Sequence, residues 1–186
     1  MTPLSATPRA ATVDDVPAVV ALVQSAYRGD ASRAGWTTEA DLLDGQRADD
    51  AMVHALIGAP GSTVLVLDDD RPGGGRGRLL ACCHVQERGD GSCYVGMLAV
   101  RPDAQARGLG RAMLGAAEAR ARRTGADRLE MTVIAQRTEL IAWYERLGFT
   151  DTGERSPFPY GDERFGLPRR TDLEFAHLAR SLAAGR

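Results

Sequence analysis

The sequence contains no lysine and no asparagine, and only 5% of its residues are aromatic. Its positive charge therefore comes from arginine, and the 23 basic residues are nearly balanced by 25 acidic ones, for a net charge of −2. This balance argues against a partner held by bulk charge, so we expect no binding of nucleic acid. Apolar runs such as residues 64–67 are far shorter than the roughly 18 to 20 residues of a membrane-spanning helix, so we expect no membrane partner.

Cysteine is also scarce. Cys82, Cys83 and Cys93 form an odd set with one adjacent pair, which suits neither a disulfide framework nor a metal site. We therefore predict buried, reduced thiols and no bound metal. The first residues lack the basic start and the apolar stretch of a secretory signal, which favours the cytoplasm.

What is present is typical of a globular protein. Of the 186 residues, 44% are hydrophobic and 26% are charged, and no linker-like segment divides the chain. We expect a single domain over residues 1–186.

Hydrophobic periodicity predicts the order of helices and strands. The expected strands are residues 6–11, 63–67, 79–87, 92–100, 128–134, 149–154 and 173–178; the expected helices run from a Thr12 cap to Gly29 and over residues 37–43, 49–57, 108–123 and 138–147. If Glu87 pairs with Ser92, Glu87 and Tyr94 share one face of the central hairpin and His84, which we interpret as structural, lies on the other. Residues 156–168 form a long loop that is a candidate functional segment.

A glycine-rich loop follows the strand expected over residues 92–100. The strand ends at Val100, and Gly108 and Gly110 stand where the next helix begins. Glycines without a Cβ let the unpaired N–H groups of a helix start approach a phosphate, and Arg107 and Arg111 can add charge. A dinucleotide site is less well supported, because Met113 replaces the third small residue of that fingerprint. An ordinary strand-to-helix turn also remains open.

A second stretch, Tyr144 to Phe149, ends the helix over residues 138–147, where Tyr144 alone reads as a half-buried aromatic residue. Together, the Gln105-x-x-Gly108-x-Gly110 loop and the later Tyr-Glu-Arg-Leu-Gly-Phe stretch resemble the GCN5-related N-acetyltransferases. The resemblance covers about residues 8–180. It implies an α/β (α+β) fold with a central mixed, mostly antiparallel sheet of six or seven strands, splayed at the fourth and fifth strands and flanked by four or five helices.

The resemblance also implies roles for individual residues. Backbone N–H groups of the loop would hold the diphosphate of acetyl-CoA, the co-substrate; these residues are Gln105, Ala106, Arg107, Gly108, Leu109, Gly110 and Arg111. Main-chain groups of Leu98, Ala99 and Val100 would bind the pantetheine arm, and the Leu98 N–H would polarise the thioester carbonyl. Tyr144 would contact the coenzyme and protonate the leaving thiolate. Arg137 stands where many members carry an asparagine that contacts the coenzyme.

The implied activity is transfer of the acetyl group to a primary amine by direct attack in a ternary complex. No motif fixes the general base; Glu87 or Tyr94 could accept the amine proton, and we predict Glu87. Acidic, aromatic and arginine residues are mixed in residues 27–47 and 154–170, so a small amine, an amino acid or a peptide N-terminus all remain open as acceptor. Two other functions remain open: a non-catalytic acetyl-CoA-binding module and a nicotinamide-dependent oxidoreductase. The resemblance also leaves a homodimer open, since dimers are common in this family.

Overall fold

A seven-stranded sheet organises the computed structural model, which describes residues 7–69 and 77–182. Its strands lie in the order β1-β3-β4-β5-β6-β9-β7, and every pairing is antiparallel except the parallel pair β5·β6. The strands are β1 (Arg9–Ala10), β3 (Ser62–Asp68), β4 (Leu79–Glu87), β5 (Ser92–Val100), β6 (Arg128–Ile134), β7 (Thr150–Pro157) and β9 (Glu174–Ser181). The expected mixed, mostly antiparallel α/β fold is therefore confirmed.

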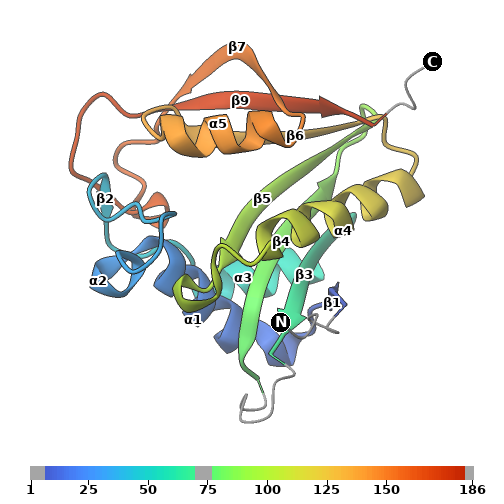
Figure 1. Cartoon of the computed structure of the whole chain (residues 1–186), viewed down its shortest axis with the longest axis horizontal. Helices are drawn as coiled ribbons and strands as arrows, with labels where there is room; N and C mark the ends of the chain where they lie inside the picture. Colours follow the sequence, from blue (N-terminus) through green and yellow to red (C-terminus); the bar gives the residue numbers. More distant parts are fainter. Residues whose placement is uncertain (1–6, 70–76, 183–186) are drawn as a thin grey trace.

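Helices cover both faces of this sheet. They are α1 (Val16–Tyr27), α2 (Gly29–Ser32), α3 (Asp50–Gly58), α4 (Leu109–Arg123) and α5 (Thr138–Arg146), with 3-10 turns at Val13–Asp15, Pro102–Ala104 and Glu163–Phe165. Figure 1 shows α4 in front of β4 and β5, with α1 and α3 behind. Successive side chains of a strand point to opposite faces of the sheet, so the strands contribute to two hydrophobic cores. Val95 packs in the core on the α4 side, and Val66 packs in the core on the α1 side. No helix among the described residues is long and apolar enough to cross a membrane.

The sheet opens between β5 and β6. These strands pair only through residues 92–94 and 128–130, after which they diverge toward the end of β5 (Figure 1). Within the open part, β5 carries an extra residue relative to β4, and Met97 takes a positive φ of 49°. A bulge of this kind takes backbone groups out of the ladder, and beyond residue 94 the β6 side of β5 has no strand partner among the described residues.

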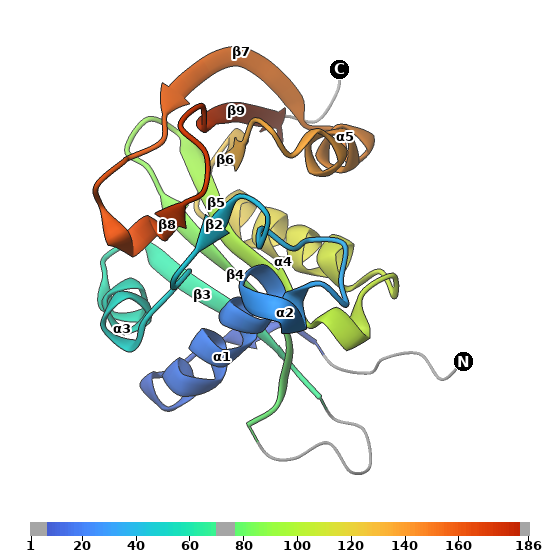
Figure 2. The ribbon, with the colours of Figure 1, turned by 90° about the vertical axis from the view of Figure 1, so that its left-hand side faces the viewer.

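The helix predicted over residues 37–43 was wrong. The segment forms turns and then the two-residue strand β2 (Leu43–Asp44), which pairs with β8 (Leu167–Pro168) (Figure 2). Long-range contacts outweigh the local helix preference, because the Glu39 backbone N–H donates to the Tyr27 carbonyl and its side chain joins a buried ion-pair cluster. The β2–β8 pair ties this segment to the long loop that precedes β9.

The predicted register of the central hairpin was also wrong. Glu87 pairs with Cys93, not with Ser92, and Gln86 pairs with Tyr94. A shift of one residue moves a side chain to the opposite face, so Tyr94 lies on the side of His84 and Glu87 on the side of α4. His84 is buried, and its Nε2 lies 2.9 Å from the Ser62 hydroxyl oxygen, a contact that fits the structural role expected of it.

Candidate active site

Two adjoining cavities lie in the opening of the sheet. The outer cleft, about 240 Å³, lies between the end of β5, the glycine loop and α5. The second, which we call the inner cavity, is about 120 Å³ and lies between β5, β6 and the segments that carry β2 and β8. Both cavities are lined by Tyr27, Leu98, Leu140 and Tyr144. These four residues mark a junction where a group bound in one cavity can meet a group bound in the other.

The glycine loop presents backbone donors to the outer cleft. Ala106 and Gly108 both have positive φ, 60° and 76°, which turns successive N–H groups toward one side of the chain. Within the described chain, no protein acceptor receives the N–H groups of residues 106–111. Arg107 and Arg111 flank them, exposed and without an ion pair to any described residue. Free donors and two unpaired guanidiniums fit the diphosphate of a coenzyme.

The Gln105 side chain has a structural task beside this loop. It donates to the Val100 carbonyl (3.1 Å) and the Thr37 hydroxyl (2.9 Å), and it accepts from the Trp36 N–H (2.9 Å). These bonds hold Trp36 at the cleft, where its ring meets the Trp143 ring edge-on at 5.8 Å. Trp36 had been placed only among the mixed aromatic and acidic residues of the acceptor segment, because its partners Gln105 and Trp143 lie far away in the chain.

The β5 bulge places Leu98 at the junction. The Tyr27 hydroxyl at the end of α1 donates to the Leu98 carbonyl oxygen, which fixes the strand at this point. Burial raises the pKa of Tyr27 to about 12, so its hydroxyl keeps its proton and remains a donor at neutral pH. The sequence placed Tyr27 in a helical pattern and at the start of the acceptor segment, residues 27–47, but gave it no role of its own.

Tyr144 is held rigidly by other aromatic rings. It is 5% exposed and contacts Trp143 and Phe149 edge-on, with ring centroids 4.9 and 5.7 Å away. Burial raises the pKa of Tyr144 well above its usual value, since the phenolate would lose hydration there. The residue is therefore a protonated phenol that lines both cavities.

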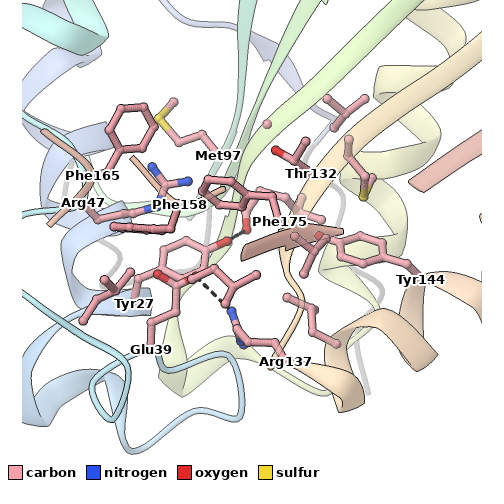
Figure 3. Close-up of a pocket in the computed structure, with 18 of the residues that line it drawn as sticks. Tyr27, Glu39, Arg47, Met97, Thr132, Arg137, Tyr144, Phe158, Phe165 and Phe175 are labelled. Carbon is pink, nitrogen blue, oxygen red and sulfur yellow. Dashed lines mark hydrogen bonds and ion pairs between the residues drawn. The ribbon is translucent and has the colours of Figure 1, made fainter. Parts of the chain in front are cut away.

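An arginine-rich cluster lines the inner cavity. Arg28 donates to Glu39 in an ion pair, and Arg137 binds the other Glu39 oxygen at 3.2 Å (Figure 3). Burial opposes ionisation of Glu39, but the nearby Arg47, Arg137 and Arg28 outweigh it and lower the pKa of this carboxyl. The Arg137 guanidinium thus faces Glu39 in the inner cavity and does not line the outer cleft, where we had expected it to bind the coenzyme.

The placement of Glu87 near the open part of the sheet was wrong. Because of the register shift, its carboxylate points toward α4 and pairs with Arg120 at 3.0 Å. It lines neither cavity. The other candidate base, Tyr94, does line the inner cavity, where its hydroxyl lies 2.9 Å from the Thr132 hydroxyl and bridges β5 and β6.

A mixed sheet that splays beside a loop of free N–H groups is the arrangement that the resemblance to the GCN5-related N-acetyltransferases implies. The sequence matches the model of the Acetyltransferase (GNAT) family over residues 22–149, and the chain belongs to this family. The expected co-substrate, acetyl-CoA, is the co-substrate of this family. No curated protein sequence matches the chain significantly.

Solved structures share the fold over nearly the whole chain. The Escherichia coli ribosomal-protein-S18-alanine N-acetyltransferase superposes with a TM-score of 0.68, 19% identity and coverage of 97% of this chain and 96% of its own. The structure of the acetyltransferase yncA from Salmonella typhimurium, solved with acetyl-CoA, superposes with a TM-score of 0.67 and 19% identity. The match covers 98% of this chain and 96% of yncA. The structure of a protein named as a phosphinothricin N-acetyltransferase superposes with a TM-score of 0.67 and 18% identity, and the match covers 97% of this chain and 100% of the other. At these identities the likeness is one of fold.

Proposed function

We propose that this protein transfers the acetyl group of acetyl-CoA to a primary amine by direct attack within a ternary complex. The observation that carries the proposal is the junction, where Leu98 of the bulged strand and the protonated Tyr144 line both cavities. A coenzyme in the outer cleft and an amine in the inner cavity would meet there. Holding the two reactants together supplies much of the rate enhancement of such a transfer.

Backbone groups of the protein would hold acetyl-CoA in the outer cleft. The N–H groups from Ala106 to Arg111, with the Arg107 and Arg111 guanidiniums, would bind the diphosphate. The Gln105 N–H, which we had expected to join them, donates instead to the Pro102 carbonyl oxygen at 3.5 Å. Main-chain groups of residues 98–100 at the open edge of β5 would pair with the pantetheine arm, as an added strand does. This arrangement would direct the thioester toward Leu98.

The chemistry needs an oxyanion donor and an acid. The amine nitrogen attacks the thioester carbon, the C–S bond breaks, and the Leu98 N–H steadies the negative charge that develops on oxygen. Tyr144 gives its proton to the departing thiolate and then takes one back from water. Glu39 is the one carboxylate lining the inner cavity among the described residues, and its ion pairs keep it ionised and occupied. We therefore assign no side chain as the base and propose that the amine proton leaves to water.

Thiol release from acetyl-CoA tests this function. The purified protein is incubated with acetyl-CoA and a panel of polyamines, amino acids, aminoglycosides, arylalkylamines and short peptides. We expect amine-dependent release of coenzyme A with at least one class, above the rate without amine. Tight binding of acetyl-CoA with no release for any amine would contradict an enzyme and favour a non-catalytic coenzyme-binding module.

A further inference from the structure

The inner cavity carries an excess of buried positive charge. The Arg28 and Arg137 side chains are 1% and 8% exposed, yet they share a single carboxylate, that of Glu39. Arg47 lines the same cavity, with its guanidinium 5.6 Å from the centre of the Tyr27 ring and no carboxylate within ion-pair distance among the described residues. Three guanidiniums thus face one carboxylate. Charge buried without a partner costs free energy, so an anionic ligand would stabilise this arrangement.

One donor in the cluster also lacks a partner. The Arg28 Nε–H is buried and bonds to no described group, while the other Arg28 nitrogens reach Glu39 and, at 3.4 Å, the Phe165 carbonyl oxygen. Buried donors are normally satisfied, so this unpaired N–H adds to the free-energy cost of burying the cluster.

Another part of the cavity wall is apolar. Met97, Phe158, Phe165 and Phe175 come from three separate segments and gather around Arg47 (Figure 3). Phe158 is held by its neighbours, with ring centroids of Phe165 and Phe175 at 6.4 and 5.6 Å. A ligand here would meet positive charge on one side and aromatic surface on the other.

We propose that the acceptor is a free amino acid with an apolar side chain, whose carboxylate binds the guanidiniums of the inner cavity while its amino group faces the junction. This inference rests on the proposed function and names its acceptor class. The Tyr27 hydroxyl bonds to the Leu98 carbonyl, and Arg47 lies over the same Tyr27 ring, so the anion subsite adjoins the transfer point. Because the anion subsite adjoins the transfer point, the acceptor should carry its carboxylate near its amine. An α-amino acid does so, since one carbon separates the two groups.

The same charges select against other acceptors. A polyamine or aminoglycoside would bring further positive charge against three arginines, which is repulsive. A peptide N-terminus has no carboxylate beside its amine and would leave the guanidiniums unpaired. A bidentate Arg–carboxylate contact gives the amino acid both affinity and orientation.

Matched acceptors test the carboxylate directly. L-Leucine and L-phenylalanine are compared with their carboxamides and with the amines that lack the carboxyl group, isoamylamine and phenethylamine. We expect kcat/KM for the acids to exceed that for the amides and the decarboxylated amines by about 100-fold or more, as for sites built around one polar group. Equal or faster turnover of the amines without carboxylate overturns the inference and leaves acetyl transfer itself standing.

An arginine variant locates the subsite. Arg47→Gln removes the guanidinium that lacks an ion pair, so it breaks neither of the ion pairs that Glu39 forms with Arg28 and Arg137. We expect KM for the amino acid to rise about 10- to 100-fold, the effect of losing a charge-assisted contact, with KM for acetyl-CoA unchanged. Arg33→Gln is the matched control, because Arg33 is exposed and pairs with Asp41 outside the cavity. An unchanged amino acid KM in Arg47→Gln contradicts the subsite.

Calorimetry separates failure of this inference from failure of the proposed function. L-Leucine and L-phenylalanine are titrated into the protein saturated with coenzyme A, so that no turnover is needed. Binding that Arg47→Gln weakens and Arg33→Gln preserves supports the subsite even in a protein without turnover. If coenzyme A binds and neither amino acid does, the inference is overturned.

Discussion

Replacing Tyr144 with phenylalanine is expected to lower kcat by about 100- to 10,000-fold, the usual effect of removing a general acid. The ring remains, so its edge-on contacts with Trp143 and Phe149 persist and the cavities keep their shape. The Kd for acetyl-CoA is therefore expected to stay within about threefold, because the phenol acts on the leaving thiolate and not on ground-state binding. Steady-state turnover and calorimetry measure the two quantities separately.

Tyr160→Phe provides the control for this change. The Tyr160 side chain lines neither cavity, and its hydroxyl accepts a hydrogen bond from the Leu173 backbone N–H. The Tyr160→Phe variant therefore also loses a phenol oxygen, but at a site outside the junction. Its kcat is expected to stay within about threefold of the unmodified protein's value. If Tyr144→Phe turned over as fast as Tyr160→Phe, Tyr144 would not be the acid.

The second large effect is expected from Gly110→Glu, which should raise the Kd for acetyl-CoA by at least about 100-fold. A Cβ at this position would lie 3.2 Å from the Trp143 ring, so the aromatic wall of the outer cleft would have to move. The new carboxylate would also stand among the N–H groups proposed to hold the diphosphate, where like charges repel. Calorimetric titration with acetyl-CoA measures the loss.

Gly115→Glu separates these effects from a general change in the helix. Gly115 lies on the same helix, α4, and a Cβ there would meet no atom within 4 Å. Both variants add one negative charge and remove one helical glycine, which by itself favours the helix. Normal acetyl-CoA affinity is expected in Gly115→Glu. Tight binding in Gly110→Glu as well would mean that the diphosphate lies elsewhere.

Local patterns in the sequence were sufficient for most elements. The strands β3 to β6 and helices α1 and α3 to α5 lie within a few residues of the predicted ranges, because each has its own periodicity and end signals. The glycine loop between β5 and α4 could also be predicted, since its backbone geometry depends on Gly108 and its neighbours. Its free N–H groups then follow from the start of the helix.

Features that depend on distant partners could not be predicted in this way. The turn between β4 and β5 is one residue longer than predicted, which places Glu87 on the α4 side of the sheet. The turn sequence could not show this, because the pairing of the whole sheet decides the register of the hairpin. The segment with Glu39 resembled a helix, but Arg28 and Arg137, far away in the chain, draw it into turns. The arginine cluster is thus a product of tertiary structure, and residue types alone left the acceptor open.

The central claim is that acetyl-CoA and an amine meet at Leu98 and Tyr144 and that the acetyl group passes directly to nitrogen. The most direct test is mass spectrometry of the acceptor and of the protein after reaction with acetyl-CoA carrying a ¹³C-labelled acetyl group. We predict label on the amine nitrogen of the acceptor, in an amount equal to the coenzyme A released, and no label on the protein. Label trapped on a cysteine, or coenzyme A released with labelled acetate as the product, would contradict direct transfer.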